Sequence, residues 1–295
     1  MHPTDTGRGP AMDRSNIPFR PTAFSRQAAF TLIELLVVIV VIAILAALLL
    51  SALQSAKLRA QQIRCLNNLR QMAIARQMYW DDFGFFQNSS PGPYSTWPDR
   101  FKPYGMTSSL LLCPSTFATN SGPVYDSLQG TADHPWVVPA SSLDYRDRSM
   151  STINVGSYAL NIYFTQPWYL TDGWQFGRRT PAHPSETPVF GENISPVDGP
   201  LGDALPATNL YTGSLTTYYP TMGDEYRGMS TFTIARHGKR SASAAPRHVD
   251  ISKPLPGAID LALYDGHVEK APLETLWTYY WSANWWIPSP RPGER

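Results

Sequence analysis

The chain has 295 residues, and its 24 lysines and arginines against 23 aspartates and glutamates give a formal net charge of +1. A nearly neutral chain whose basic residues form no block, apart from those along one helix described below, is not typical of nucleic-acid-binding proteins, so we predict no nucleic-acid partner. Aromatic residues make up 12% of the chain, which argues against a disordered tail and for one packed globular domain.

The most distinctive feature is an apolar segment at residues 30–53, FTLIELLVVIVVIAILAALLLSAL, which contains one charged residue, Glu34. The 19 residues from Leu35 to Leu53 carry no charge, and a helix of that length crosses the roughly 30 Å core of a bilayer. A carboxylate in lipid costs roughly 2.5 to 3.5 kcal/mol at the centre and less near the surface. We therefore predict a single transmembrane helix whose Glu34 needs a partner, such as a free amine at Phe30.

Residues 29–34, AFTLIE, resemble the processing site of type IV pilins and type II secretion pseudopilins. In that family a prepilin peptidase cuts before the Phe and methylates the new amino group. The resemblance implies a leader over 1–29, cleavage between Ala29 and Phe30, N-methylation of Phe30, and pairing of Glu34 with the methylated amine of a neighbouring subunit. Two positions depart from the family pattern, because Ala29 replaces the usual Gly and Ser51 replaces a Pro that commonly kinks the helix.

A cleaved secretory signal and a plain signal anchor are the alternatives for this segment. A secretory signal has an apolar core of about 7 to 15 residues, which is shorter than this run, and the following LSALQSAK matches a signal-peptidase site poorly. The flanking charges do not orient the helix, because more basic residues follow it than precede it, against the positive-inside rule. An N-terminus in the cytoplasm and a C-terminal domain outside it are therefore implied by the resemblance.

The helix is predicted to continue beyond the membrane as an amphipathic extension over 54–82. This stretch lacks Gly and Pro, and apolar residues recur at three- and four-residue spacings from Leu58 to Ala73. The apolar stripe is expected to dock on a sheet, and Gly84 is expected to end the helix. Five basic side chains are expected to remain exposed: Lys57, Arg59, Arg64, Arg70 and Arg76.

A β-rich globular domain is predicted over 83–295. Strand patterns occur at 153–164, 187–191 and 231–235, and residues 258–264 and 267–269 flank Asp265 and Gly266, a pair that favours a tight primed turn. The stretches 84–150 and 198–228 are expected to consist of loops. The predicted fold class is α+β and pilin-like, with the long helix packed on an antiparallel sheet that has long loops.

The chain has two cysteines, Cys65 and Cys113. They are consistent with an oxidising compartment but too few for a disulfide scaffold. A loop-closing bridge between them and two separate buried thiols are both compatible with the sequence.

The resemblance extends beyond the membrane helix. The segments CLNNLRQ at 65–71, CPS at 113–115, SYALN at 157–161, RHG at 236–238 and YDGHVE at 264–269 look like the large pilin-like proteins of planctomycetes, verrucomicrobia and their relatives. Those proteins carry a C-terminal motif of a histidine, nine residues and Asp-Gly. Here the spacing is longer, and the Arg-His-Gly context favours His237 over His248 as the family histidine, with an insertion from Lys239 to Pro256.

Two metal hypotheses arise from the C-terminal half. His267 and Glu269 alternate on a predicted strand, so they face one side and, with His237 or His248 and Asp265, are candidates for a divalent metal site. The simpler interpretation is a structural turn at Asp265 and Gly266 with hydrogen-bonded or solvated histidines. Pseudopilins often hold Ca²⁺ in a C-terminal loop, and oxygen-rich positions that lack calcium-loop spacing occur at Asp198, Asp203, Asp224 and Glu225.

Catalytic motifs are not evident, since the sequence has no Gly-x-Ser-x-Gly elbow, His-Glu-x-x-His helix or phosphate loop. We therefore do not predict an enzyme. A C-terminal cluster of aromatic residues is suited to core or subunit packing, or to contact with a glycan: Trp277, Tyr279, Tyr280, Trp281, Trp285 and Trp286.

The sequence thus predicts a structural subunit of a type IV pilus-like or type II secretion pseudopilus fibre, held in the inner membrane by one span. Its implied partners are the prepilin peptidase, other pilin or pseudopilin subunits, an inner-membrane assembly platform and membrane lipid. The alternative is an extracytoplasmic binding domain for a glycan or polymer, or a catalytic domain, that uses a pilin-type leader for export.

Overall fold

The computed structural model of the chain describes residues 30–86, 97–116, 129–138, 154–165, 175–177, 179–213 and 228–294. The predicted leader, including Ala29, lies outside the described residues. The chain divides into two compact units at the boundary between Leu50 and Ser51. Helix α1, Leu32–Phe83, is 52 residues long and contributes to both.

In the first unit, the side chains of residues 30–50 are all exposed. The apolar part of α1 has a mean hydropathy of 3.3 and buries nothing inside the chain, and α1 is the one described helix that is long and apolar enough to cross a membrane. A surface this apolar requires lipid or other subunits around it.

In the second unit, α1 buries one face from Cys65 to Trp80. The helix ends at Phe83, where Gly84 adopts a φ of +71° and donates its N–H to the Trp80 carbonyl at 2.7 Å. A left-handed glycine satisfies a terminal carbonyl in this way, as the sequence predicted for Gly84.

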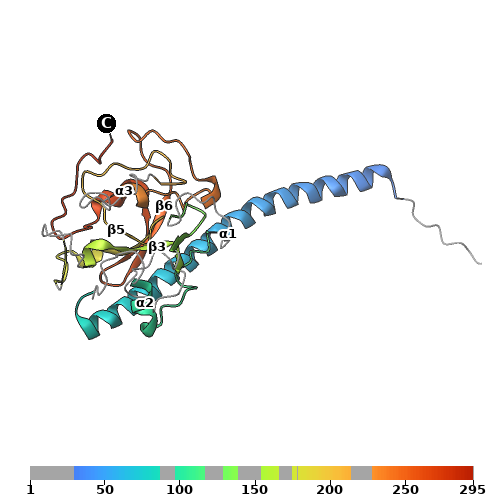
Figure 1. Cartoon of the computed structure of the whole chain (residues 1–295). Coiled ribbons are helices and arrows are strands. Elements are labelled where there is room, and N and C mark those ends of the chain that lie inside the picture. Colours follow the sequence, from blue (N-terminus) through green and yellow to red (C-terminus); the bar gives the residue numbers. More distant parts are fainter. Residues whose placement is uncertain are drawn as a thin grey trace, which may run out of the picture. The chain divides into compact units, whose positions relative to one another are not determined.

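A five-stranded sheet, in the order β5-β3-β4-β6-β7, packs against this part of α1 (Figure 1). Its strands are β3 (Tyr158–Asn161), β4 (Pro188–Glu192), β5 (Val197–Asp198), β6 (Ala258–Leu263) and β7 (Val268–Pro272). Neighbouring strands are antiparallel except β5, which runs parallel to β3. A separate pair is formed by β1 (Trp136–Val138) and β2 (Asn154–Gly156). Short helical turns are α2 (Trp97–Phe101), α3 (Met229–Phe232), η1 (Lys102–Tyr104), η3 (Ile162–Phe164), η4 (Pro184–Glu186), η5 (Ala242–Ala244) and η6 (Leu273–Thr278).

Two apolar cores cover the two faces of the sheet. Tyr158, Leu160 and Phe190 belong to the core that contains the buried residues of α1. The other core contains Ala159 and Leu261 together with C-terminal tryptophans. Successive residues of a strand point to opposite faces, so the neighbours Tyr158 and Ala159 belong to different cores. The central strands are therefore buried on both sides.

This architecture confirms the predicted α+β class, in which a long N-terminal helix packs on a sheet. The sheet is mixed and not purely antiparallel, because β5 pairs in parallel with β3. The predicted strand at 153–164 is interrupted at Ser157 and stops at Asn161, whose side chain caps the turn η3 by accepting from the Tyr163 N–H at 3.1 Å.

The predicted strand at 231–235 is wrong. Residues up to Phe232 belong to α3, and the following residues form no strand of the sheet. Phe232 and Ile234 are fully buried in the core behind the sheet. Their burial produced an apolar pattern typical of a strand, although no neighbouring strand pairs with them in the described residues.

Candidate functional site

The start of α1 is the segment that the sequence predicts to be processed. Phe30 is 72% exposed. The Thr31 N–H and hydroxyl both donate to Glu34 Oε2, at 2.9 and 2.7 Å, and the Glu34 N–H donates to the Thr31 hydroxyl oxygen at 3.2 Å. These reciprocal bonds form a capping box, in which two side chains satisfy free N–H groups at a helix start.

The capping box gives Glu34 a partner within its own chain, Thr31. This partner was not predicted from the sequence. The spacing Thr-x-x-Glu before an apolar run was the available signal. The carboxylate is bound at the N–H of Thr31, the residue directly after Phe30, so it is held close to the amine that cleavage would create.

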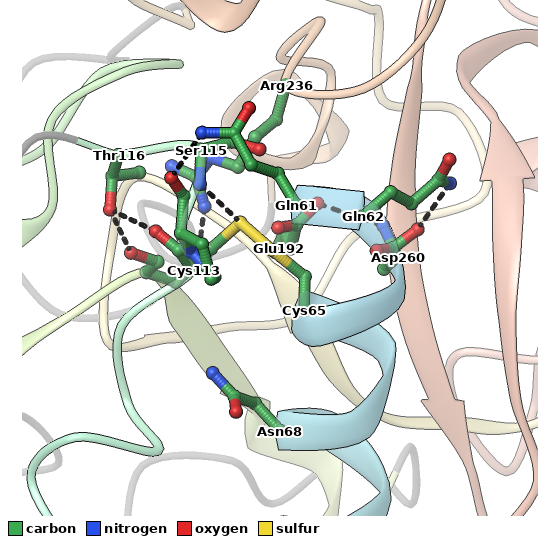
Figure 2. The surroundings of a disulfide bond; sticks show 12 residues. Gln61, Gln62, Cys65, Asn68, Cys113, Ser115, Thr116, Glu192, Arg236 and Asp260 are labelled. Carbon is green, nitrogen blue, oxygen red and sulfur yellow. Dashed lines mark hydrogen bonds between the residues drawn. A yellow bond between two sulfur atoms is a disulfide. The ribbon is translucent and has the colours of Figure 1, made fainter. Parts of the chain in front are cut away.

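A disulfide joins Cys65 of α1 to Cys113, with 5.0 Å between the Cα atoms (Figure 2). Gln61 and Asn68 lie on the same face of α1 as Cys65 and donate to the Pro114 and Leu112 carbonyls, each at 2.9 Å. Three side chains at helical spacing thus attach the segment 112–114 to α1. The two cysteines are 48 positions apart in the sequence, so the bridge closes a long loop.

A buried cluster of charged side chains lies beside the disulfide. His237 Nε2 is 3.1 Å from Glu192 Oε1 and 3.3 Å from Asp260 Oδ2, and all three side chains are almost fully buried. Gln62 of α1 donates to Asp260 Oδ1 at 3.1 Å, as Figure 2 shows. Asp260 also donates its backbone N–H to Glu192 Oε2 at 3.0 Å. The cluster therefore connects α1, β4, β6 and the chain at His237.

Burial and the charges within the cluster shift the pKa values of Asp260 and His237. Burial and the charge of Glu192 raise the pKa of Asp260 to about 7. Burial lowers the pKa of His237, but the Glu192 and Asp260 carboxylates outweigh this effect, so the net shift is upward. An imidazolium at His237 is thus stabilised mainly by the charge of Glu192, which also favours the protonated form of Asp260.

Arg236 is buried next to His237 and is satisfied by main-chain oxygens. Its guanidinium donates to the carbonyls of Thr131, Ala132 and Ser157 at 2.5 to 2.9 Å. Because a guanidinium has five donors, one side chain holds together segments that are distant in the sequence. Sequence reasoning missed Glu192 and Asp260, although an acid within an apolar strand pattern, as in AIDLAL, was the available signal.

The predicted metal ligands are not brought together. Among the described residues, the group of at least three metal-type donors that lie within 4.8 Å of one another consists of Cys65, Cys113, Glu192 and His237, and it includes neither His267 nor Glu269. The disulfide engages both sulfurs, and the two other members of that group, Glu192 and His237, are paired with each other.

The side chains of His267 and Glu269 have separate partners. His267 Nδ1 contacts Asp265 Oδ1 at 2.9 Å, and Glu269 accepts from the Tyr279 hydroxyl at 2.6 Å. Of the calcium candidates, Asp198 is buried and accepts from Thr231 and Gly199, whereas Asp224 and Glu225 lie outside the described residues.

The hairpin between β6 and β7 differs in its turn from the prediction. Leu263 and His267 pair across it, so Tyr264, Asp265 and Gly266 form a three-residue loop instead of a two-residue primed turn. The Gly266 N–H donates to the Leu263 carbonyl at 3.0 Å, and Gly266 has a φ of +90°. This is the pattern of a three-residue hairpin loop that places a left-handed residue last.

The same turn holds α1. Arg70 donates to the Gly266 carbonyl at 2.8 Å, and Arg76 donates to the Tyr264 carbonyl at 3.3 Å. The prediction that Arg76 is exposed is wrong, because its guanidinium is buried over the rings of Tyr264 and Trp80, at 4.0 and 4.5 Å from their centroids. A planar guanidinium stacks on aromatic faces, which makes such burial favourable.

The aromatic C-terminus is mainly core. Trp277, Trp281 and Trp285 are buried, and each indole N–H donates to a main-chain carbonyl. Trp286 is 48% exposed. Buried tryptophans with paired N–H groups are typical of structural packing, which was one of the two predicted uses of this cluster.

A family model described as a prokaryotic N-terminal methylation motif matches residues 24–50. The match covers the end of the leader and most of the apolar helix, and it does not reach the globular domain. Comparison with curated proteins gives no match, and comparison with solved structures gives none either. The chain therefore carries a prepilin-type leader and one apolar helix for membrane anchoring, which implies processing by a prepilin peptidase and assembly with other pilin subunits.

Proposed function

We propose that the chain is a non-enzymatic subunit of a type IV pilus-like or type II secretion pseudopilus fibre. The observation that carries the proposal is the methylation motif at residues 24–50, which includes an apolar segment, residues 30–50, whose side chains are all exposed. In this function the helix holds the subunit in the inner membrane until an assembly platform extracts it. The same helices then bundle in the fibre, with Glu34 paired to the methylated Phe30 amine of a neighbour.

The disulfide supports an extracytoplasmic position for the globular domain, because disulfides persist in oxidising compartments. The proposal also includes the C-terminal module of the large pilin-like proteins, with His237 as its histidine. In support, His237 and Ala258 exchange main-chain hydrogen bonds of 2.9 and 2.8 Å. The intervening residues are thus an excursion, and β6 leads directly from Ala258 to the turn at Asp265 and Gly266.

The absence of catalysis is part of the proposal. Its support is that the buried polar side chains His237, Glu192 and Arg236 are engaged with one another or with main-chain groups. The competing function is a membrane-anchored binding domain. Two cavities lined by residues of the segment 236–240 favour it, because a cavity can hold a ligand.

The test is the intact mass of the mature chain extracted from membranes, together with its recovery in sheared fibres. We expect a chain that begins at Phe30 and carries one methyl group. Replacing Ala29 by Leu should block cleavage, since the peptidase requires a small residue there, while the precursor still inserts. A mature N-terminus after Ala47, or fibres that lack the chain while their assembly system is active, would contradict the proposal.

A further inference from the structure

A cavity of about 340 Å³ in the globular unit is lined by an unusual number of basic side chains. Arg59 of α1, Lys239 and Arg240 of the chain after His237, and Lys270 of β7 all contribute to its wall, and all four are exposed. Elements distant in the sequence therefore converge to place four cations around one hollow.

These cations have no ion-pair partner among the described residues. Glu192 and Asp260 are buried and already engaged with His237 and Gln62. Of the four cations, the charge of Lys270 acts on Asp260, but the two side chains form no ion pair. Like charges around one cavity repel one another and create a positive potential. A bound anion would relieve this repulsion.

A second cavity of about 500 Å³ adjoins the first, since both are lined by His237, Gly238, Lys239, Arg240 and Lys270. Its remaining wall is largely apolar and consists of alanines and prolines, with Gly257: Ala235, Ala245, Pro246, Pro256, Gly257, Ala258 and Pro272. A basic cavity next to an apolar one matches a molecule that has an anionic head and an apolar body, and it does not match a simple inorganic anion.

The position of the basic cavity along the chain indicates the class of ligand that it suits. Ser55 and Arg59 line it, and they follow Leu53, the end of the apolar segment, by two and six residues. At about 1.5 Å per helical residue, α1 keeps Arg59 within roughly 9 Å of the end of the membrane segment. Lipid headgroups occupy this level, and each cation near an anionic membrane surface contributes to binding.

We propose that the two cavities bind an anionic phospholipid, with its phosphate among Arg59, Lys239, Arg240 and Lys270 and its glycerol and upper acyl chains against the apolar wall. Such a lipid would hold the globular unit at the membrane surface. The proposal rests on membrane anchoring and is independent of the fibre function.

The test uses the full mature chain in neutral detergent, with lipid binding measured by native mass spectrometry and thermal unfolding. The probes are phosphatidylglycerol, phosphatidylcholine, glycerol phosphate and inorganic phosphate. The pocket variant is Lys239→Gln with Arg240→Gln. The control variant is Lys57→Gln with Arg64→Gln, which removes two exposed cations from the same stretch of α1 that do not line the cavity.

We expect phosphatidylglycerol to bind and to raise the unfolding temperature, with phosphatidylcholine and the two soluble phosphates much weaker. The pocket variant should bind phosphatidylglycerol about thirtyfold more weakly, whereas the control should change little. Equal losses in both variants would show unspecific surface attraction and overturn the proposal. Equal effects of inorganic phosphate and phosphatidylglycerol would also overturn it, because the apolar cavity would then have no role. Fibre incorporation of the pocket variant, measured separately, reports on the fibre function alone.

Discussion

Glu34 has one role that the structure shows, capping of the helix start, and a second that we propose, charge pairing between subunits. As a member of the capping box it accepts from the Thr31 N–H, and in the proposed fibre its charge pairs with the Phe30 amine of a neighbouring subunit. Within that proposal, the buried ion pair would set the register between subunits more than it would add stability. The local bond explains how a carboxylate at the mouth of an apolar helix is stabilised in the single subunit.

Variants at Glu34 and Thr31 should distinguish the two roles. Glu34→Gln keeps a capping side chain and removes the charge, so we expect normal insertion but reduced recovery in sheared fibres. Thr31→Ala removes the hydroxyl at a cost of about 1 kcal/mol to the helix start and keeps the charge, so assembly should persist. If Thr31→Ala impairs fibre recovery as strongly as Glu34→Gln, capping and not charge pairing is the important role.

The sequence correctly predicted a turn between β6 and β7 but not its geometry. The pair Asp265 and Gly266 indicated a hairpin, but the loop contains three residues because Leu263 pairs with His267. The carbonyls of Tyr264 and Gly266 accept from α1, so the turn positions the helix as well as the strands.

Gly266→Val should destabilise the globular unit. A Cβ at this position would meet nothing within 4 Å, so the cost arises from the left-handed backbone at a φ of +90° and not from a clash. We expect a loss of about 1 to 2 kcal/mol in denaturant unfolding. Gly266→Asn is the matched control, since Asn tolerates this conformation, and it should lose clearly less. Equal losses would show that the side-chain space and not the backbone is limiting.

The disulfide is the strongest single link between α1 and the segment 112–114. With its cysteines 48 positions apart in the sequence, the chain-entropy model gives a stabilisation of about 4 kcal/mol. Replacing both cysteines by alanine should therefore lower the unfolding temperature of the chain substantially, and a thiol reductant should do the same to the wild type but not to the variant. An unchanged unfolding temperature in the double variant would show that Gln61 and Asn68 suffice.

At the scale of the whole molecule, the sequence predicted the parts that depend on local pattern. The apolar helix, its end at Gly84 and the strand pattern of β6 follow from hydrophobicity and turn residues. The pairing of β5 with β3, the helical turn at Met229–Phe232 and the convergence of Glu192, Asp260 and His237 depend on contacts between distant segments. Phe232 and Ile234 are buried in the core without belonging to a strand, and they produce the same apolar pattern as a strand does. Periodicity alone does not distinguish a buried strand from another buried segment.

Buried titratable groups in separate parts of the globular unit all change its stability in the same direction as the pH rises. Burial raises the pKa of Asp198 to about 7, and burial with the charge of Glu192 raises the pKa of Asp260 to about 7. The folded chain therefore holds protons that the unfolded chain releases near pH 4, so stability falls as the pH rises from about 4 to 7. The raised pKa of His237 acts in the same direction, because its stabilising charge is lost above its folded pKa.

We accordingly expect the unfolding temperature of the chain to fall between about pH 5 and pH 8. Asp198 contributes to this decline on its own, whereas Asp260 and His237 contribute jointly because they face each other. Asp198→Asn and Asp260→Asn should each make the decline shallower and leave the chain at least as stable as wild type at pH 8. Asp250→Asn, at an exposed position, is the control and should leave the slope unchanged. An unfolding temperature that rises over this range would mean that these carboxyls are ionised in the folded chain and that the buried charges are compensated more fully than their contacts indicate.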